Sequence, residues 1–388
     1  MKKYTIGYLL MTILAGSCQG QEKVPVPGAC QPDLYGRLIK GRSVAVVANQ
    51  TSMADDKHLV DKLMEMGTRI KAIFAPEHGF RELADAGETI KDGIDIATGI
   101  PVISLYGTHR KPTQENLRGI DLLLFDIQDV GARFYTYIST LHYVMEACAE
   151  NNVKLIVLDR PNPNGFYFDG NIADTAYRSF VGMHPVPVVH GMTVGEYAQM
   201  INGEGWLKNG IKCDLTVIKC KNYTHKTLYE LPVRPSPNLP NQTSVYLYPS
   251  LCFFEGTNIS VGRGTPFPFQ VFGSPKLPDR GFSFTPESVP GAANPPFLGF
   301  KCYGTDLRNA IAEKLVPAPS INLEWIIGAY NDYPEKENFF TGYFDVLAAG
   351  PVLREQIRKG MSASEIRETW KEGLRRFSAV REKYLLYE

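Results

Sequence analysis

Residues 43–49 read Ser43-Val-Ala-Val-Val-Ala-Asn49, an apolar run without polar alternation. Four similar runs follow before residue 160: Ile70-Lys-Ala-Ile-Phe-Ala75, Pro101-Val-Ile-Ser-Leu-Tyr106, Asp121-Leu-Leu-Leu-Phe-Asp126 and Lys154-Leu-Ile-Val-Leu-Asp159. Continuous apolar runs indicate strands covered on both faces, as in a parallel sheet. Between the last two runs, an apolar stripe at helical spacing predicts a helix along Ile138, Leu141, Met145 and Cys148. The sequence therefore predicts a doubly wound, Rossmann-like α/β domain.

Composition narrows the class of protein. The chain has 388 residues, 41 basic and 41 acidic side chains, and 44% hydrophobic content. This composition excludes a disordered or collagen-like chain. Nucleic-acid-binding proteins usually carry an excess of basic residues, whereas the formal net charge of this chain is zero, so we expect no nucleic-acid partner.

Residues 1–18 have the pattern of an export signal. Lys2 and Lys3 precede the apolar run 6–14, and Ala15-Gly-Ser-Cys18 is a small-residue cleavage site. The apolar run is too short to span a bilayer as a helix. Cys18 stands where a bacterial lipoprotein is acylated, although Ala15 replaces the usual Leu, and simple cleavage by signal peptidase is the alternative. We expect an exported protein, periplasmic or in the outer membrane, with membrane attachment through a lipidated Cys18.

The proline-rich stretch Arg234-Pro-Ser-Pro-Asn-Leu-Pro-Asn241 excludes a central strand or helix and marks a domain boundary. We predict a Rossmann-like domain over residues 24–235 and a smaller α+β domain over 236–388. Short strands and ordered loops are expected through Phe300. The chain should end in a helix that begins at the capping box Ser362-x-x-Glu365.

Polar residues follow nearly every predicted strand, and the ligand crevice of an open parallel sheet lies beyond these carboxyl ends. The candidate binding residues there are Asn49, His78, Arg81, Gln128, Asp129, Arg133, Asp159 and Arg160. A single Asp after a strand is often only a helix cap, but five polar strand ends together favour a functional cleft. The first turn, Asn49-Gln-Thr-Ser-Met-Ala54, contains no glycine, and no Gly-x4-Gly-Lys loop occurs, so we expect no nucleotide cofactor. The histidine and cysteine spacings match no metal site, and no metal is expected.

The segment Glu77-His-Gly-Phe-Arg81 is the sharpest single feature. Pro76 ends the preceding strand and Gly79 permits a reversal, so Glu77 should project into the crevice. Under an apolar roof such as Phe80, the pKa of Glu77 would rise, which suits a general acid. The alternative is a structural ion pair between Glu77 and Arg81.

Further carboxylates lie in two other segments. In Asp126-x-Gln-Asp129-x-Gly-x-Arg133, either aspartate could complete a glycosidase pair or hold sugar hydroxyls, whereas Asp129 could equally cap the next helix. The segment Phe254–Thr265 offers Glu255, Asn258 and Arg263 among many aromatic residues. Aromatic faces beside carboxylates are typical of carbohydrate sites, although the same rings could simply be core. An interdomain cleft is the natural place for such a site.

Taken together, these segments resemble the bacterial exo-β-N-acetylmuramidase family of the NamZ type. The similarity rests on five stretches and the C-terminal helix: Asn49-Gln-Thr, Glu77-His-Gly-Phe-Arg81, Asp126-x-Gln-Asp-x-Gly-x-Arg-Phe-Tyr-Thr-Tyr137, Leu158-Asp-Arg-Pro-Asn-Pro163, Glu255-Gly-Thr-Asn-x-Ser-x-Gly-Arg-Gly-Thr265, and Trp370, Phe377, Arg381 and Tyr384. The resemblance covers nearly the whole mature chain. It implies a site between the two domains and release of N-acetylmuramic acid from the non-reducing end of peptidoglycan fragments.

The resemblance makes Glu77 the leading catalytic candidate, and we expect Asp126 or Glu255 to support it. The lactyl carboxylate of muramic acid needs a cation of fixed geometry, for which Arg81, Arg133 and Arg263 are available. The 2-acetamido group permits either a second carboxylate or the acetamide itself to act, and both routes stay open.

Two other functions are weighed against this one. A cell-wall esterase or amidase would need a nucleophile on a tight elbow, and no Gly-x-Ser-x-Gly occurs. A non-catalytic, envelope-anchored glycan-binding protein would keep the aromatic residues and arginines but would not need a buried acid.

Overall fold

The computed structural model of the chain describes residues 24–77, 79–81 and 92–388. The predicted export signal, with Cys18, and His78 therefore lie outside the described residues. Within the described part, no helix is both long enough and apolar enough to cross a membrane.

A seven-stranded sheet organises the first part of the chain, in the order β5-β6-β4-β1-β7-β8-β9. Its strands are β1 (Ser43–Ala48), β4 (Arg69–Ala75), β5 (Gly93–Ile94), β6 (Pro101–Ser104), β7 (Leu122–Asp126), β8 (Lys154–Leu158) and β9 (Leu215–Ile218). Every pair is parallel except β5 with β6. The six parallel strands have the 3-2-1-4-5-6 order of Rossmann folds, which confirms the predicted fold class.

Helices cover both faces of this sheet, as the apolar runs predicted. Val44 and Val46 of β1 pack in one core with α1 (Pro32–Ile39) and α2 (Leu59–Glu65). Their neighbours Ala45 and Val47 point to the other face, in the core that contains α3 (Tyr137–Asn151) and α4 (Val194–Gly203). Successive side chains of a strand point to opposite faces, so a strand buried on both sides must be apolar throughout.

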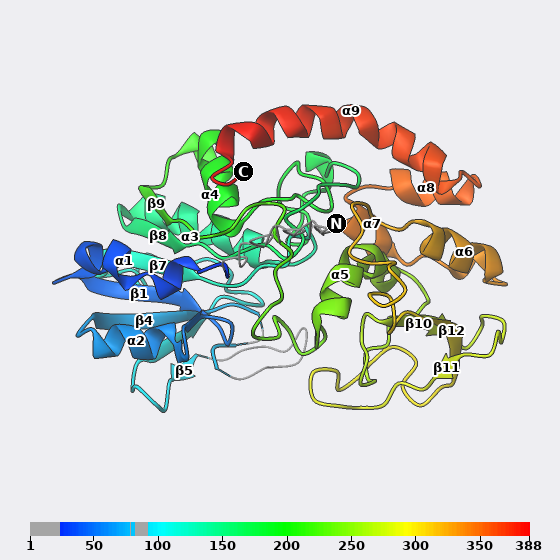
Figure 1. Cartoon of the computed structure of the whole chain (residues 1–388), viewed down its shortest axis with the longest axis horizontal. Helices are drawn as coiled ribbons and strands as arrows, with labels where there is room; N and C mark the ends of the chain where they lie inside the picture. The colour runs from blue at the N-terminus through cyan, green and yellow to red at the C-terminus, as the bar shows by residue number, and fades with distance from the viewer. Residues whose placement is uncertain (1–23, 78, 82–91) are drawn as a thin grey trace, which may run out of the picture.

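The smaller C-terminal region combines helices with a three-stranded antiparallel sheet in the order β10-β12-β11 (Figure 1). Its elements are α5 (Gln242–Leu251), η4 (Cys252–Gly256), β10 (Val271–Ser274), β11 (Ser283–Phe284), β12 (Cys302–Asp306), α6 (Glu324–Asp332), α7 (Gly342–Ala348), α8 (Val352–Arg358) and α9 (Ala363–Arg381). The remaining short elements are the hairpin β2 (Met53–Ala54) and β3 (Lys57–His58), and the 3-10 turns η1 (Gly28–Cys30), η2 (Thr175–Tyr177), η3 (Lys208–Gly210), η5 (Lys336–Asn338) and η6 (Glu382–Tyr384).

The expectation of only strands and loops through Phe300 is wrong for residues 242–256, which are helical. Asn241 caps the start of α5 by accepting a hydrogen bond from the backbone of Ser244, whose side chain binds back to the N-cap. This reciprocal cap satisfies backbone donors that the first turn of any helix leaves free.

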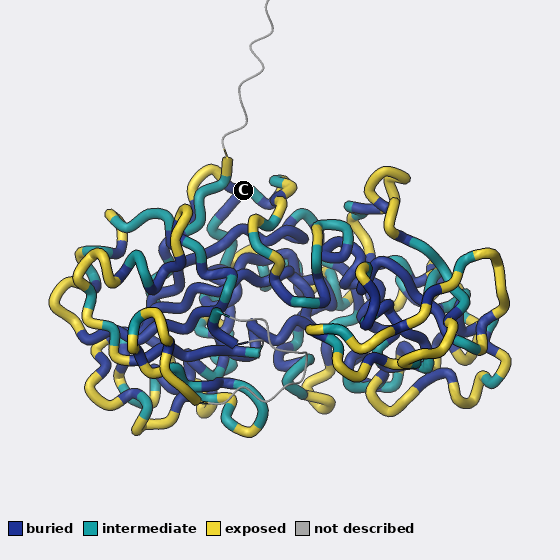
Figure 2. The backbone as a smooth tube through the Cα atoms, turned by 90° about the horizontal axis from the view of Figure 1, so that it is seen from below, coloured by how far each residue is buried: buried dark blue, intermediate teal, exposed yellow. Residues whose placement is uncertain are grey.

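Helix α9 connects the two parts of the molecule (Figure 1). It begins at the predicted capping box, Ser362 with Glu365, beyond α8 in the C-terminal region. Beyond its other end, the hydroxyl of Tyr387 donates to Asp159 at 2.6 Å, at the end of β8. The buried core continues between the two parts, as the dark segments in Figure 2 show.

Candidate active site

A cavity of about 400 Å³ lies where the Rossmann-like part meets the C-terminal region. The sheet side contributes Glu77, Tyr106, Arg110, Phe134, Tyr135, Thr136, Tyr137, Ser179, Phe180 and Val181. The other wall comes from Ser236, Asn238, Leu239, Tyr248, Glu255, Arg263, Phe269, Tyr343 and Val346. A concave, aromatic-lined space of this volume suits one or two sugar rings.

Glu77 reaches the cavity because β4 ends at Ala75 and the chain reverses immediately afterwards. The backbone amide of Gly79 donates to the carbonyl of Pro76 at 3.1 Å, and Gly79 has a φ of 86°, which favours glycine. The hydroxyl of Thr136 donates to Glu77 Oε2 at 3.2 Å. The hydroxyl of Tyr137 donates to the carbonyl oxygen of Glu77 at 3.3 Å. Thr136, which precedes α3, therefore holds the side chain of Glu77, and Tyr137, the first residue of α3, holds its backbone.

The surroundings of Glu77 correct two expectations. Phe80 is no roof over the cavity, because it is buried in the core of the α1 and α2 face, with its ring 4.8 Å from that of His58. Arg81 pairs with Asp61 at 2.6 Å and with Asp95 at 2.9 Å, instead of with Glu77 or a ligand. Nearby carboxylates hold this guanidinium, so it is not a cavity cation.

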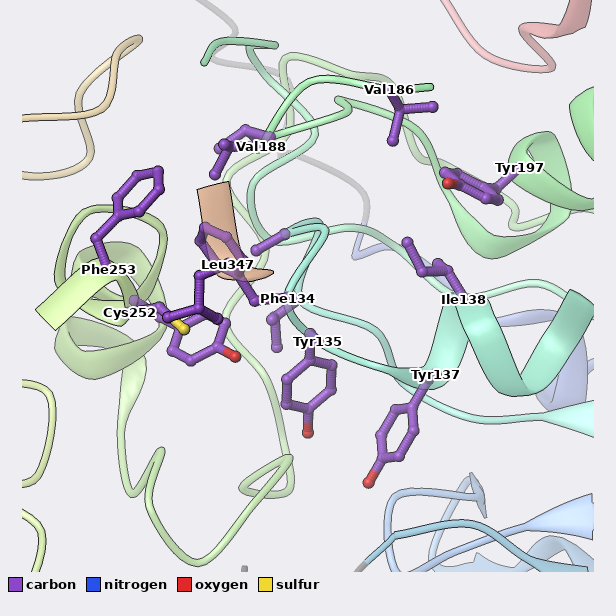
Figure 3. Close-up of a cluster of buried hydrophobic side chains, with 14 of the residues drawn as sticks. Phe134, Tyr135, Tyr137, Ile138, Val186, Val188, Tyr197, Cys252, Phe253 and Leu347 are labelled. Atoms are coloured by element: carbon purple, nitrogen blue, oxygen red, sulfur yellow. The ribbon is translucent and has the colours of Figure 1, made fainter. Parts of the chain in front are cut away.

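Tyrosines surround the carboxylate of Glu77. Tyr135 and Tyr137 precede and begin α3, and Figure 3 shows both side chains extending toward the same side of the loop. Their rings meet edge to face at 4.7 Å. Burial, and then the charge of Glu77, raises the pKa of both Tyr106 and Tyr137. The phenols therefore remain protonated and can donate hydrogen bonds at neutral pH.

Glu255 stands on the opposite wall, in η4, as part of an ion pair. Its Oε1 accepts from Arg263 Nε at 2.6 Å, and the Arg263 guanidinium lies 5.1 Å from the centre of the Phe269 ring. Burial raises the pKa of Tyr343, and the charges of Cys252, Glu255 and Glu77 raise it further. The phenol of Tyr343 is thus within electrostatic reach of both cavity carboxylates.

Asp126 is not in the cavity, which corrects its expected role as a supporting carboxylate. Its side chain is fully buried at the end of β7 and accepts from Arg160 Nε at 2.6 Å and Nη2 at 2.8 Å. Arg160 also donates to the carbonyl of Met53 at 2.8 Å. This bidentate ion pair joins the carboxyl ends of β7 and β8, so neither residue is available to a ligand.

Asn49, Gln128, Asp129 and Asp159 are also buried away from the cavity wall. Asn49 donates to the hydroxyl of Tyr137 at 2.9 Å and so acts on Glu77 only indirectly. Gln128 donates to the carbonyls of Asp129 and Pro161, each at 2.8 Å.

Both aspartates of this group serve the local backbone. Asp129 Oδ2 accepts from the amide of Gly131 at 2.6 Å, so it stabilises a turn instead of capping α3. Asp159 accepts from Thr193 Oγ1 and the Gly195 amide, each at 2.7 Å, at the start of α4. Burial raises the pKa of Asp159 to about 6.

Neither Arg133 nor Asn258 lines the cavity: Arg133 joins the two parts of the molecule, and Asn258 is bound within the C-terminal region. Arg133 is 1% exposed and donates to the carbonyls of Asn171, Val186 and Leu347 at 2.8, 2.9 and 3.1 Å. Burial lowers its pKa to about 10. Asn258 Nδ2 donates to the carbonyl of Asn338 at 2.5 Å. Around Arg133, Phe134 packs on Phe253 at 5.1 Å, and both rings lie in the buried cluster of Figure 3.

Of the predicted site residues, the structure therefore brings Glu77, Glu255 and Arg263 together. It adds wall residues that were not among the candidates, chiefly Tyr106, Arg110, Thr136, Tyr137 and Tyr343. Thr136 and Tyr137 end the Phe-Tyr-Thr-Tyr137 segment and Tyr106 ends a predicted strand, so the sequence did contain a signal for these three. Tyr343 comes from a distant helix that carries no recognisable motif.

Metal and disulfide chemistry have no visible site in the described part of the chain. It contains no group of three or more His, Cys, Asp or Glu placed to hold a metal ion. All six cysteines from Cys30 to Cys302 are free thiols.

Comparison with known proteins assigns the chain to a family. Residues 44–243 match the family model of the N-terminal domain of the exo-beta-N-acetylmuramidase NamZ, and residues 246–387 match that of its C-terminal domain. The chain belongs to the NamZ family. It is 41% identical over 375 residues to the peptidoglycan beta-N-acetylmuramidase NamZ of Bacillus subtilis (strain 168), covering 92% of this chain and 89% of that protein.

Two solved structures share the NamZ fold. Both are DUF1343 family proteins from Bacteroides fragilis NCTC 9343. One is 47% identical with a TM-score of 0.88, and the other is 28% identical with a TM-score of 0.77. Each comparison covers 94% of this chain and 99% of the other. The NamZ models meet between residues 243 and 246, and a domain boundary at residue 235 stays a prediction.

Proposed function

We propose that this protein is a glycoside hydrolase that releases N-acetylmuramic acid from the non-reducing end of peptidoglycan fragments, with Glu77 as its general acid and base. The observation that carries this proposal is a carboxylate placed in an aromatic-lined cavity between the two parts of a NamZ-family chain. A curated relative that is 41% identical is a peptidoglycan beta-N-acetylmuramidase.

The chemistry follows from the contents of the cavity. Glu77 transfers its proton to the glycosidic oxygen while the C1–O bond breaks and its electron pair passes to the leaving sugar. In one pair of routes, an oxygen of Glu255 or the 2-acetamido carbonyl of the substrate bonds to C1; water then attacks C1, that bond breaks, and a proton of the water returns to Glu77. In the third route, water attacks C1 directly and gives its proton to Glu255.

The surrounding residues support this role for Glu77. Thr136 donates to one carboxylate oxygen of Glu77 and so fixes the orientation of the proposed acid. Tyr106 and Tyr248 line the cavity with apolar rings that carry a polar hydroxyl. Such side chains suit a sugar, which has apolar ring faces and hydroxyl groups around its edge. Arg263 donates to Glu255 at 2.6 Å, and this contact fixes the position of the carboxylate that would act as nucleophile or electrostatic stabiliser.

Hydrolysis of 4-nitrophenyl β-N-acetylmuraminide tests the proposal, with the N-acetylglucosamine analogue as the matched control. We expect nitrophenol release from the first compound and little from the second. A glycan-binding protein would bind the muramic acid compound without cleaving it. An esterase or amidase would release neither chromophore but would cleave acylated or peptide-bearing cell-wall fragments.

We also propose that the protein is exported and anchored through a lipidated Cys18. The support is the charged start at Lys2 and Lys3, the short apolar run and the small-residue cleavage site. Radiolabelled palmitate should enter the wild-type protein but not Cys18→Ala, and equal labelling of both would refute the anchor.

A further inference from the structure

Of the described residues that line the cavity, two are arginines, and only one of them is paired with a carboxylate. Arg263 is paired with Glu255 at 2.6 Å, so its charge is already compensated. Arg110 has no carboxylate partner among the described residues, and its Nε donates only to the backbone carbonyl of Gly107 at 2.9 Å. The remaining nitrogens of the Arg110 guanidinium are therefore free to bind an anion.

The position of Arg110 is fixed by the turn after β6. Gly107 has a φ of 73°, which favours glycine, and its carbonyl oxygen accepts the hydrogen bond from Arg110. The guanidinium lies 4.4 Å from the centre of the Phe180 ring. The loop of Phe180 is tied to α3, because Ser139 Oγ donates to the carbonyl of Phe180 at 2.7 Å. Stacking orients a guanidinium while its edge stays open for a bidentate contact.

Arg110 also lies near the catalytic candidate. The phenol of Tyr106 is within electrostatic reach of both groups, since the charge of Glu77 raises its pKa and the charge of Arg110 lowers it. Glu255 and Arg263 compensate each other, so Arg110 is left, among the described residues that line the cavity, as a positive charge without a carboxylate partner. A substrate with a single carboxylate near its scissile bond matches that charge.

We propose that Arg110 recognises the lactyl carboxylate of N-acetylmuramic acid and thereby discriminates against N-acetylglucosamine. This inference rests on the proposed function and names the residue that sets its substrate specificity. N-Acetylglucosamine lacks the lactyl group and leaves the arginine unpaired, whereas muramic acid supplies a planar carboxylate that fits its fork. Arg81 and Arg133, which the sequence also offered for this role, are excluded, because carboxylates hold Arg81 and backbone carbonyls hold Arg133.

The test compares two substrates that differ only at the lactyl group: 4-nitrophenyl β-N-acetylmuraminide and its lactyl amide. In Arg110→Met, kcat/KM for the free acid should fall roughly 10- to 100-fold, the value of hydrogen bonds to a charged group, mainly through KM. The same variant should cleave the neutral amide within about threefold of the wild type. For the free acid, kcat/KM of Arg110→Lys should lie between those of the wild type and Arg110→Met, because lysine keeps the charge but loses the bidentate geometry.

The matched control is Arg118→Met, which changes an arginine of the same loop region that is paired with Glu115 and 77% exposed. It should leave both substrates unaffected. An equal loss on both substrates in Arg110→Met, or no loss on either, would overturn the assignment. Comparing the melting temperatures of all variants separates a folding defect from a loss of recognition, and Arg110→Lys provides the same comparison if the methionine variant does not fold.

Failure of the proposed function gives a different result. A wild-type protein that cleaves neither muramic acid compound would refute the hydrolase and this inference with it. A wild-type protein that hydrolyses the free acid, with an Arg110→Met variant that keeps the same preference for it over the amide, would refute only the role of Arg110.

Discussion

The hydroxyl of Thr136 donates a hydrogen bond of 3.2 Å to Oε2 of Glu77, joining the loop before α3 to the end of β4. The adjacent Tyr137 holds the backbone of Glu77 and is itself bound by Asn49. These contacts bring the ends of β1 and β4 together with the start of α3. They leave the carboxylate little freedom to rotate, which is what a proton donor to a single glycosidic oxygen requires.

Glu77→Gln should abolish hydrolysis without unfolding the protein. Glutamine keeps the size of the side chain and can still accept from Thr136, but it has no proton to transfer. We expect turnover of a muramic acid–glucosamine disaccharide to fall by about 100-fold or more. Glu368→Gln, at a 67% exposed position on α9, is the matched control. Wild-type turnover in Glu77→Gln would remove this residue from the mechanism.

Thr136→Val removes the hydroxyl while keeping the shape of the side chain. We expect kcat to fall about tenfold with little change in KM, because a hydrogen bond to a charged group is lost. The side chain of Thr136 does not cap α3, so the helix should persist. Thr136→Ser keeps the hydroxyl and should retain most activity in steady-state kinetics. Equal losses in both variants would point to packing instead.

Asp126→Ala should destabilise the protein while leaving the chemistry of the folded molecules intact. It leaves Arg160 buried and unpaired, and breaking a buried pair costs about 3–5 kcal/mol of unfolding free energy. Denaturant unfolding measures the loss, and activity per folded molecule should remain within a few-fold of the wild type. Glu372→Ala, in a pair exposed at the surface of α9, should change stability little. A stable but inactive Asp126→Ala would restore a catalytic role for Asp126.

Stability should fall as the pH drops from 6.5 to 4 because of His142. Its Nδ1 lies 2.9 Å from His184 Nε2, while Arg178 Nη2 lies 3.2 Å from its Nε2. Burial, and then the charge of Arg178, lowers the pKa of His142 to about 4. In the unfolded chain His142 binds a proton below about pH 6.5, whereas in the folded protein it stays neutral until about pH 4. The contribution of neutral His142 to the free energy of unfolding is therefore fully present above pH 6.5 and is lost as the pH falls toward 4.

The measurement is unfolding free energy against pH for the wild type and His142→Asn. The wild type should lose roughly 1 to 2 kcal/mol more per pH unit in this window than the variant. Glu146 and Lys111 also face this histidine, so both should be left unchanged in the comparison. Parallel curves for the two proteins would contradict the assignment.

The sheet could be predicted from the sequence because its signal is local. Val44 to Val47 must be apolar on both faces of a covered strand, and that requirement is visible in the residues themselves. The start of α9 was equally visible, since a capping box needs only Ser362 and Glu365. Helix α5 was not predicted, because the proline-rich stretch before Asn241 and the aromatic residues after it favoured loops and short strands over a helix capped at Asn241.

The site was predicted less completely, and the reason is geometric. Asp126 and Glu77 both follow a strand, yet Asp126 meets Arg160 inside the protein and Glu77 meets the cavity. Phe80 was expected to cover Glu77, but the turn between them directs Phe80 into the core on the α1 and α2 face of the sheet. No spacing in the sequence distinguishes these outcomes, because each depends on which distant side chain occupies the neighbouring space.

By itself, the sequence determined the layered α/β architecture, the resemblance to one family and the placement of an acid directly after β4. Those properties follow from periodicity, turns and caps, which act over a few residues. Only the tertiary structure decided which charged groups face the cavity, because Arg81, Arg133 and Arg160 are each held by partners far away in the chain. It also showed that no carboxylate in the described part of the chain pairs with Arg110, because ion pairing depends on which side chains the fold brings together.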